Sequence, residues 1–458
     1  MAQTQKKVEL ADVKQTLGRM DLMSIAVGQI IGSGVMTMSI KALGMTGRAV
    51  NIAFVVAAIF TIFGAFPSIF ASSVLRMRGG LYTQGLIFLG ERFAGFWIVT
   101  QILAKISMSM HAVGLVDYLV NLVPGLAPMH KWLTFGVLTF FFVLNFFGTE
   151  YMAKAQTFMF YLLVIALVMF TVMGLPRVHW SGYFGNELFG QPLMSNGISG
   201  IVEAASYLTF ATGGATVILS FSADAKDPGK DFPFVIIVST TGVAFLYALL
   251  ATCIGGIMPP EEVLAAGTLG PIAKAIMPSW AYYFFMVAGA MFALGTTLNS
   301  SIGSALKPFV SACEDGWFPA WIGQLHPKTQ VAWVLLIMFY AVNVPAVLFG
   351  LNVQILGKWV LVIGNVTNLI IALGVIRLPK LFPEAWAKSP FHVSDGMLKL
   401  MLGATAFTIL VQAYMNIKGL AFSIMAINVA TFAIAWLYSG WAMKSGRVHI
   451  KKSYEVLL

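Results

Sequence analysis

The chain is 458 residues long, 59% hydrophobic and only 10% charged, with a mean hydropathy of +0.84. This composition excludes a soluble globular protein and leaves room for about a dozen membrane spans of ~20 residues. The net charge of +10 does not indicate nucleic-acid binding, because the basic residues are scattered through loops between apolar segments. Cys253 and Cys313 lack metal-ligand spacing, so neither a disulfide framework nor a zinc site is indicated. No metal site and no cofactor are expected.

The apolar segments predict twelve membrane-spanning helices. Their ranges are 21–44, 49–75, 93–123, 132–149, 152–175, 197–221, 233–257, 280–306, 331–350, 355–377, 398–416 and 420–443. With a cytoplasmic N-terminus, about 20 Lys and Arg lie on the inner side and roughly seven on the outer side, which agrees with the positive-inside rule. We therefore expect a multi-pass protein of the plasma membrane, or of the inner membrane in a bacterium. Both termini would be cytoplasmic, as a leader at 1–20 and a tail at 444–458.

Glycines interrupt two of these spans near their middle. The first span contains Ile30-Ile31-Gly32-Ser33-Gly34, and the sixth contains Phe210-Ala211-Thr212-Gly213-Gly214. Because lipid cannot hydrate an exposed backbone, a span broken in this way must line a protected polar cavity. The alternative is that the glycines only allow neighbouring helices to pack closely.

The positions of the two breaks predict an internal repeat. Spans one to five, residues 21–175, and spans six to ten, residues 197–377, each begin with a broken span. An odd number of spans turns the second half over, so the two halves would form a 5+5 inverted repeat, the arrangement of many secondary transporters. Spans eleven and twelve, residues 398–443, would be peripheral helices. The expected fold class is an all-α integral membrane protein.

The two breaks expose backbone groups of opposite character. At the first break the free amides lie at a half-helix end that attracts a carboxylate. At the sixth span the free carbonyls suit an ammonium group, so a zwitterion fits between them. The predicted substrate-binding residues are Ile30, Gly32, Ser33, Gly34, Phe210, Ala211, Thr212 and Gly213.

Five motifs in order along the chain resemble one family. They are Gly28-Gln29-Ile30-Ile31-Gly32-Ser33-Gly34, Arg78-Gly79-Gly80-Leu81-Tyr82, the Phe210–Gly214 segment, the acidic and basic loop 223–233, and Glu314-Asp315-Gly316-Trp317-Phe318-Pro319 with His326-Pro327-Lys328-Thr329. Through these motifs, residues 20–380 resemble the amino acid–polyamine–organocation superfamily, whose members have the leucine-transporter-type fold.

The resemblance implies transport of an amino acid by alternating access, as exchange or cation symport. It places the substrate carboxylate on the Ser33 and Gly34 amides and the ammonium on the Ile30, Phe210 and Ala211 carbonyls. Many relatives carry a glutamate where this chain has Ala215, and L-type relatives carry an aromatic residue at the Thr212 position. We therefore expect a neutral L-amino acid, with a cationic amino acid or polyamine and an acidic amino acid as the alternatives.

Two groups of residues bear on which ion, if any, is coupled to transport. Sodium-independent relatives often carry a lysine about seven residues after a Gln in the fifth span. Here that position is Leu163, and Lys154 lies at the start of the span instead. Sodium needs hard oxygen ligands. The predicted ligands are the carbonyls of Gly28 and Ile31 and the hydroxyls of Thr296, Thr297, Ser300 and Ser301. Hydrogen bonding within helices is the alternative for these hydroxyls, and proton coupling is the alternative for the mechanism.

Ionisable residues inside spans mark function by default, because a buried charge in a bilayer is costly. Lys105 in the third span would act as a counter-ion for an acidic substrate or another carboxylate, replace the missing fifth-span lysine, or stay at the inner interface. Glu203 in the sixth span would titrate for proton coupling, attract a cationic substrate, or stay in a hydrated vestibule. His111 is expected to be a packing residue. No nucleophile and base are suitably spaced, so an enzyme is not expected. A sensor that binds an amino acid without net transport is the alternative of another class.

Overall fold

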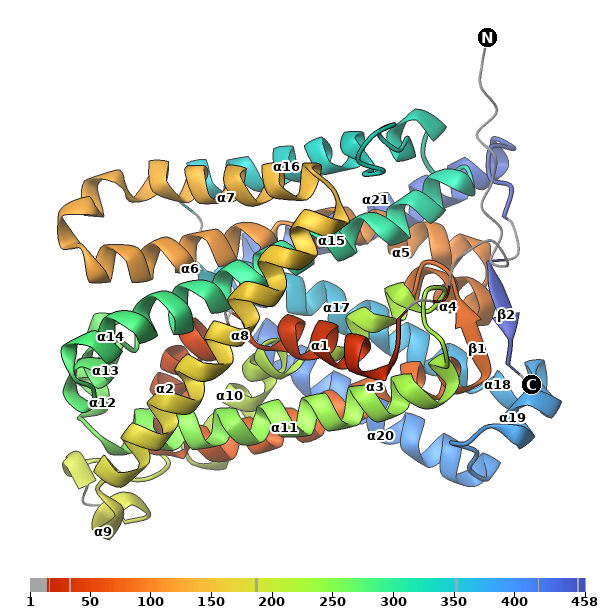
Figure 1. Cartoon of the computed structure of the whole chain (residues 1–458). Coiled ribbons are helices and arrows are strands. Elements are labelled where there is room, and N and C mark those ends of the chain that lie inside the picture. The colour runs from red at the N-terminus through yellow and green to blue at the C-terminus, as the bar shows by residue number, and fades with distance from the viewer. Residues whose placement is uncertain are drawn as a thin grey trace.

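The computed structural model describes residue 15 and residues 17–32, 34–185, 188–350, 353–418, 420–450 and 453–457. These residues form helices almost throughout, with one pair of short strands (Figure 1). Buried apolar side chains from nearly all the long helices form one large continuous core. The structure is therefore an all-helical bundle of the kind that the composition predicts.

The described residues of the first half, up to the loop before the sixth predicted span, form nine α-helices, one strand and several short π and 3-10 segments. The α-helices and strand are α1 (Arg19–Ile30), α2 (Ser39–Thr46), α3 (Val50–Val74), β1 (Leu75–Met77), α4 (Leu81–Leu89), α5 (Glu91–Ala104), α6 (Ser107–Leu122), α7 (His130–Phe146), α8 (Thr149–Gly174) and α9 (Trp180–Tyr183). The π and 3-10 segments are η2 (Gly34–Met38), η3 (Gly47–Ala49), η4 (Pro124–Met129), η5 (Leu175–Arg177) and η6 (Leu188–Gly190).

The described residues of the second half are also mainly helical. Its α-helices and strand are α10 (Gly197–Thr212), α11 (Pro228–Gly256), α12 (Pro260–Ala266), α13 (Gly270–Ile276), α14 (Ser279–Phe284), α15 (Phe292–Glu314), α16 (Trp333–Leu348), α17 (Val353–Val375), α18 (Leu378–Leu381), α19 (Pro383–Lys388), α20 (Asp395–Ile417), α21 (Phe422–Lys444) and β2 (Tyr454–Val456). Its π and 3-10 segments are η7 (Ala215–Phe221), η8 (Phe285–Met291) and η9 (Ala320–Gly323).

Each predicted span coincides with a helix or with a broken pair of helices. Within the described residues, nine helical segments are long and apolar enough to cross a membrane, and two shorter apolar helices lie at 333–348 and 360–375. The chain is therefore an all-helical, multi-pass membrane protein. The first predicted span is divided into α1, η2 and α2, so no single long helix represents it.

Both expected breaks are present, and at the second the backbone geometry explains why glycine is needed. Helix α1 ends at Ile30, and Ile31 takes extended dihedral angles before η2 begins at Gly34. Helix α10 ends at Thr212, where Gly213 is extended and Gly214 has a φ of 114°. Such a positive φ is costly for any residue with a Cβ. Ser33 lies outside the described residues.

A third break, which the sequence did not predict, divides the third span. Helix α5 ends at Ala104 and α6 begins at Ser107, so Lys105 lies at the junction of two helices that follow one another in space (Figure 1). The Ser109 amide donates a hydrogen bond to the Asn343 side chain of α16, 2.7 Å away. Because Asn343 and Ser109 are both fully buried, this bond compensates for the interrupted helical ladder.

The two described ends of the chain meet at the same end of the bundle. Strand β2 pairs antiparallel with β1, with Leu75 opposite Val456 and Met77 opposite Tyr454. At this end Leu17 also exchanges backbone hydrogen bonds with the loop after η7, through Asp224 and Lys226. Figure 1 shows β1, β2, α18 and α19 at this end and α9, α12 and α13 at the opposite end.

Candidate functional site

A cavity of about 330 Å³ lies where the broken spans meet. Its lining comes from α1, α6, α10, η7, α15 and the broken segments, including the junction between α5 and α6. The lining residues are Gln29, Ile30, Gly32, Gly34, Lys105, Ser107, Met108, His111, Thr209, Phe210, Gly213, Gly214, Val217, Thr297, Ser301 and Ser304. The cavity is thus enclosed by all three helix breaks and by α15.

The glycines of the two predicted breaks bring neighbouring backbones into close contact. A Cβ atom on Gly34 would lie 2.2 Å from the Cβ of Ala211, and one on Gly32 would lie 1.6 Å from the Thr297 hydroxyl oxygen. A Cβ on Gly214 would lie 3.2 Å from the Gln29 carbonyl oxygen. Both readings of the glycines therefore hold together: they break the spans, and they also allow the broken segments to pack against each other.

The predicted substrate-binding residues divide into those that line the cavity and those that lie behind it. Ile30, Gly32, Gly34, Phe210 and Gly213 belong to the lining. The other two described residues, Ala211 and Thr212, are buried behind it.

Two hydrogen bonds, at Thr212 and at Ile30, define what these groups offer to a ligand. The Thr212 hydroxyl lies 2.7 Å from that of Thr61 on α3, so its side chain points away from the cavity. The Ile30 carbonyl accepts a hydrogen bond of 3.0 Å from the Tyr247 hydroxyl. That bond occupies one of the two lone pairs of the carbonyl, so one remains for a ligand.

The predicted sodium ligands fall into two neighbouring groups. The hydroxyls of Thr296 and Thr297 both lie 3.5 Å from the Ile31 carbonyl oxygen, and both also donate to Ala293. Ser300 donates to the side-chain oxygen of Gln29, whose amide donates to Ser301. Gly28 packs instead beside Gln156 on α8. The structure therefore brings three of the six oxygens to one point.

Only some of the ionisable candidate residues line the cavity. Lys105 and His111 line the cavity, whereas Glu203 is half-buried on α10 outside the lining. Lys154 is exposed near the start of α8, with its ammonium 6.0 Å from the centre of the Tyr151 ring. Lys105 is therefore the lysine that reaches the site.

Comparison with known proteins decides the family. The family described as amino acid permease matches residues 17–443, which is nearly the whole chain. The chain belongs to the amino acid permease family. It is part of the amino acid–polyamine–organocation superfamily that the motifs indicated, and it is a transporter rather than an enzyme.

The relatives of this permease are named for different substrates. The branched-chain amino acid permease BcaP of Bacillus subtilis is 25% identical over 70% of this chain and 72% of its own length. The vacuolar cationic amino acid transporter 4 of Arabidopsis thaliana is 27% identical over 69% of this chain and 55% of its own. The methylthioribose transporter of Bacillus subtilis is 23% identical over 69% and 70%. Family membership therefore leaves the substrate of the permease open.

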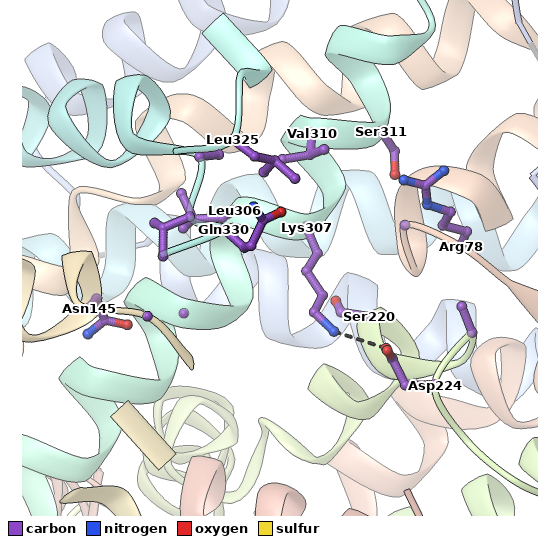
Figure 2. Close-up of a pocket in the computed structure, with 16 residues that line it drawn as sticks. Arg78, Asn145, Ser220, Asp224, Leu306, Lys307, Val310, Ser311, Leu325 and Gln330 are labelled. Atoms are coloured by element: carbon purple, nitrogen blue, oxygen red, sulfur yellow. Dashed lines mark hydrogen bonds and ion pairs between the residues drawn. The ribbon is translucent and has the colours of Figure 1, made fainter. Parts of the chain in front are cut away.

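A second cavity of about 240 Å³ lies toward the end of the permease that carries β1 and β2. Figure 2 shows Lys307 and Asp224 pointing toward one another in it, with the ammonium and carboxylate 3.0 Å apart. Lys307 also lies 3.9 Å from the centre of the Phe221 ring. Gly303 lines the second cavity and its neighbour Ser304 lines the first, so the two spaces lie against the same turn of α15.

Two loop motifs that resemble the superfamily meet beside this second cavity. The Arg78 guanidinium lies 2.9 Å from the Glu314 carboxylate, and the Tyr82 hydroxyl donates to Asp315 over 2.7 Å. Burial and the adjacent Asp315 carboxylate raise the pKa of Tyr82 above its ordinary value, so its hydroxyl keeps the proton that it donates. These motifs therefore tie the loop after α3 to the end of α15.

Sequence reasoning missed part of the lining. The first-span motif that contains Gln29 did not predict a role for this residue. Its side chain forms hydrogen bonds that connect the end of α1 to α15. Ser107 and Met108 follow the unpredicted third break, and Ser304 continues the polar face of α15. The only signal for the serines was their spacing of three to four residues along α15, at Thr297, Ser301 and Ser304.

Proposed function

We propose that this permease is a secondary active transporter that binds one L-amino acid in the central cavity and releases it by alternating access. The side chain of this amino acid carries no positive charge. The amino acid is either neutral, as the sequence predicts, or acidic. The observation that supports this choice is the charge of the site. None of the described lining residues is Asp or Glu, and one of them is a lysine. A cationic substrate would bring a second positive charge into a low-dielectric cavity.

Two features support alternating access through a 5+5 inverted repeat of twelve spans. Helix α1 packs against α11, and α10 packs against α3. An inverted repeat that superimposes α1 on α10 and α3 on α11 would also superimpose the α1–α11 pair on the α10–α3 pair. The second cavity adds a space beside the first along α15, with Arg78 and Gly79 of the loop after β1 in its lining, which suits an exit vestibule.

We further propose the plasma membrane as the location, with both termini cytoplasmic. The two described ends lie at one end of the bundle, as an even number of spans requires, and the positive-inside rule assigns that end to the cytoplasm. For coupling, the meeting of Ile31, Thr296 and Thr297 oxygens supports sodium, since sodium prefers hard oxygen ligands.

The first experiment measures thermal stabilisation of the purified protein by all L-amino acids and common polyamines, in sodium or in choline. Any ligand that binds only the folded state raises the apparent melting temperature. We expect stabilisation by neutral or acidic L-amino acids, larger in sodium, and saturable, stereoselective uptake into proteoliposomes. Stabilisation by arginine or polyamines alone would contradict the proposal, and binding without uptake would favour a sensor.

Glu203→Gln is expected to leave uptake within about twofold of the unmodified protein, because Glu203 does not line the cavity. The measurement is initial uptake of radiolabelled substrate at several concentrations. A selective loss of arginine or polyamine uptake in this variant would instead support the cationic alternative.

A further inference from the structure

We propose that Lys105 binds a carboxylate on the substrate's side chain, so that the preferred cargo is an acidic L-amino acid. This inference rests on the proposed function, because it assigns a substrate class to the same cavity. Within that cavity it gives Lys105 the role of specificity-determining residue, separate from the backbone groups of the two glycine breaks.

The third helix break places Lys105 at the site. The α5 helix stops at Ala104, and the chain turns through Lys105 and Ile106 before α6 begins. The turn is held by the buried side chain of Asn343, which accepts from the Ser109 amide. A lysine within a continuous span would extend toward the interface, but at this junction Lys105 lines the cavity beside Ser107. The break therefore fixes a cation at the substrate.

A second polar group of the cavity is also without a partner. His111 is 2% exposed, lines the cavity, and its Nδ1 atom has no hydrogen-bond partner among the described residues. Its ring stacks on Phe210, with the ring centres 6.3 Å apart. Buried polar atoms are nearly always paired in native structures, so an unpaired one on a side chain that lines a cavity supports a ligand group as its partner.

Charge balance selects the class of ligand. Lys105 forms no ion pair within the described part of the chain, and the described lining contains no carboxylate. The end of α5 offers at most roughly half a negative charge. A neutral amino acid is a zwitterion and leaves the positive charge uncompensated, whereas glutamate or aspartate brings a net charge of −1. An acidic amino acid therefore neutralises the site.

The test on the unmodified protein compares acids with their amides, which have nearly the same shape. Full-length protein in nanodiscs is titrated with L-glutamate, L-glutamine, L-aspartate and L-asparagine, and the shift in melting temperature gives each affinity. We expect the acids to bind at least about tenfold more tightly than the amides, as loss of a charge-assisted hydrogen bond predicts. Equal or tighter binding of glutamine would overturn the inference.

Variants test the residue itself. Lys105→Met and Lys105→Gln should weaken glutamate binding about tenfold or more and leave glutamine binding within about threefold. Lys105→Arg keeps the charge and should retain a preference for glutamate even if the neutral variants fold poorly. Lys154→Met is the matched control: this lysine is exposed outside the cavity, so its variant should bind both ligands normally. Unchanged glutamate binding in a folded Lys105→Met protein would overturn the inference.

The two proposals fail in different ways. If neutral amino acids bind and are transported but acids are not, the proposed function stands and the role of Lys105 is overturned. If no amino acid binds the folded protein, both are overturned.

Discussion

Gly34→Ala is expected to abolish substrate binding while the protein still inserts into the membrane. The new Cβ would lie 2.2 Å from the Cβ and 2.3 Å from the Cα of Ala211, and a backbone atom cannot yield as a flexible side chain does. Gly32→Val should act similarly, because its Cβ would lie 1.6 Å from the Thr297 hydroxyl oxygen. Either substitution pushes apart the segments that enclose the cavity.

Binding is measured by ligand-induced thermal stabilisation, and insertion by the yield of monodisperse protein from membranes. Gly64→Ala and Gly403→Ala are matched controls, since a Cβ at either position meets no atom within 4 Å and alanine favours the helix. Both controls should bind substrate normally. Normal binding by Gly34→Ala would show that the close contact of the two breaks is not required for the site.

Arg48→Met is expected to lower the stability of the whole protein by about 3 kcal/mol or more, without a direct effect on the substrate site. Arg48 is 0% exposed, and its guanidinium donates to the carbonyls of Gly185, Leu188 and Gln191, the last over 2.8 Å. Removing the guanidinium leaves three part-buried carbonyls without this donor, and an unpaired buried group costs about 1–3 kcal/mol. The loop before α10 would thereby lose three of its hydrogen bonds to the segment before α3.

The readout is the half-life at elevated temperature in detergent, because membrane proteins often unfold irreversibly. Arg177→Met is the control: Arg177 donates a single exposed bond of 2.7 Å to the Ala275 carbonyl, so its loss should cost less than about 1 kcal/mol. Similar half-lives for the two variants would mean that water replaces the Arg48 contacts.

The sequence located two of the three helix breaks. Gly214 adopts a positive φ that residues with a Cβ rarely adopt, and a glycine pair is a local signal, so it can be read without the fold. The break at Lys105 has no glycine or proline. It depends on Asn343, 234 residues after its partner Ser109, and a contact at that separation leaves no mark on the local pattern.

The short strands at the end of the bundle illustrate the same limit. Residues 444–458 read as a polar tail, but Tyr454–Val456 pairs with Leu75–Met77 and forms β2. Neither segment is long enough to predict a strand alone, since a strand of three residues exists only through its partner.

The sequence by itself determined that this chain is an all-helical membrane protein of the amino acid permease family, with glycine breaks in its first and sixth spans. Hydropathy and the backbone freedom of glycine are local properties, so they can be recognised directly in the sequence. The tertiary structure alone decided which side chains reach the cavity: Lys105 and His111 enter it, while Thr212, Glu203 and Lys154 do not. The direction of a side chain depends on how distant helices pack, and the charge of the site follows from that packing.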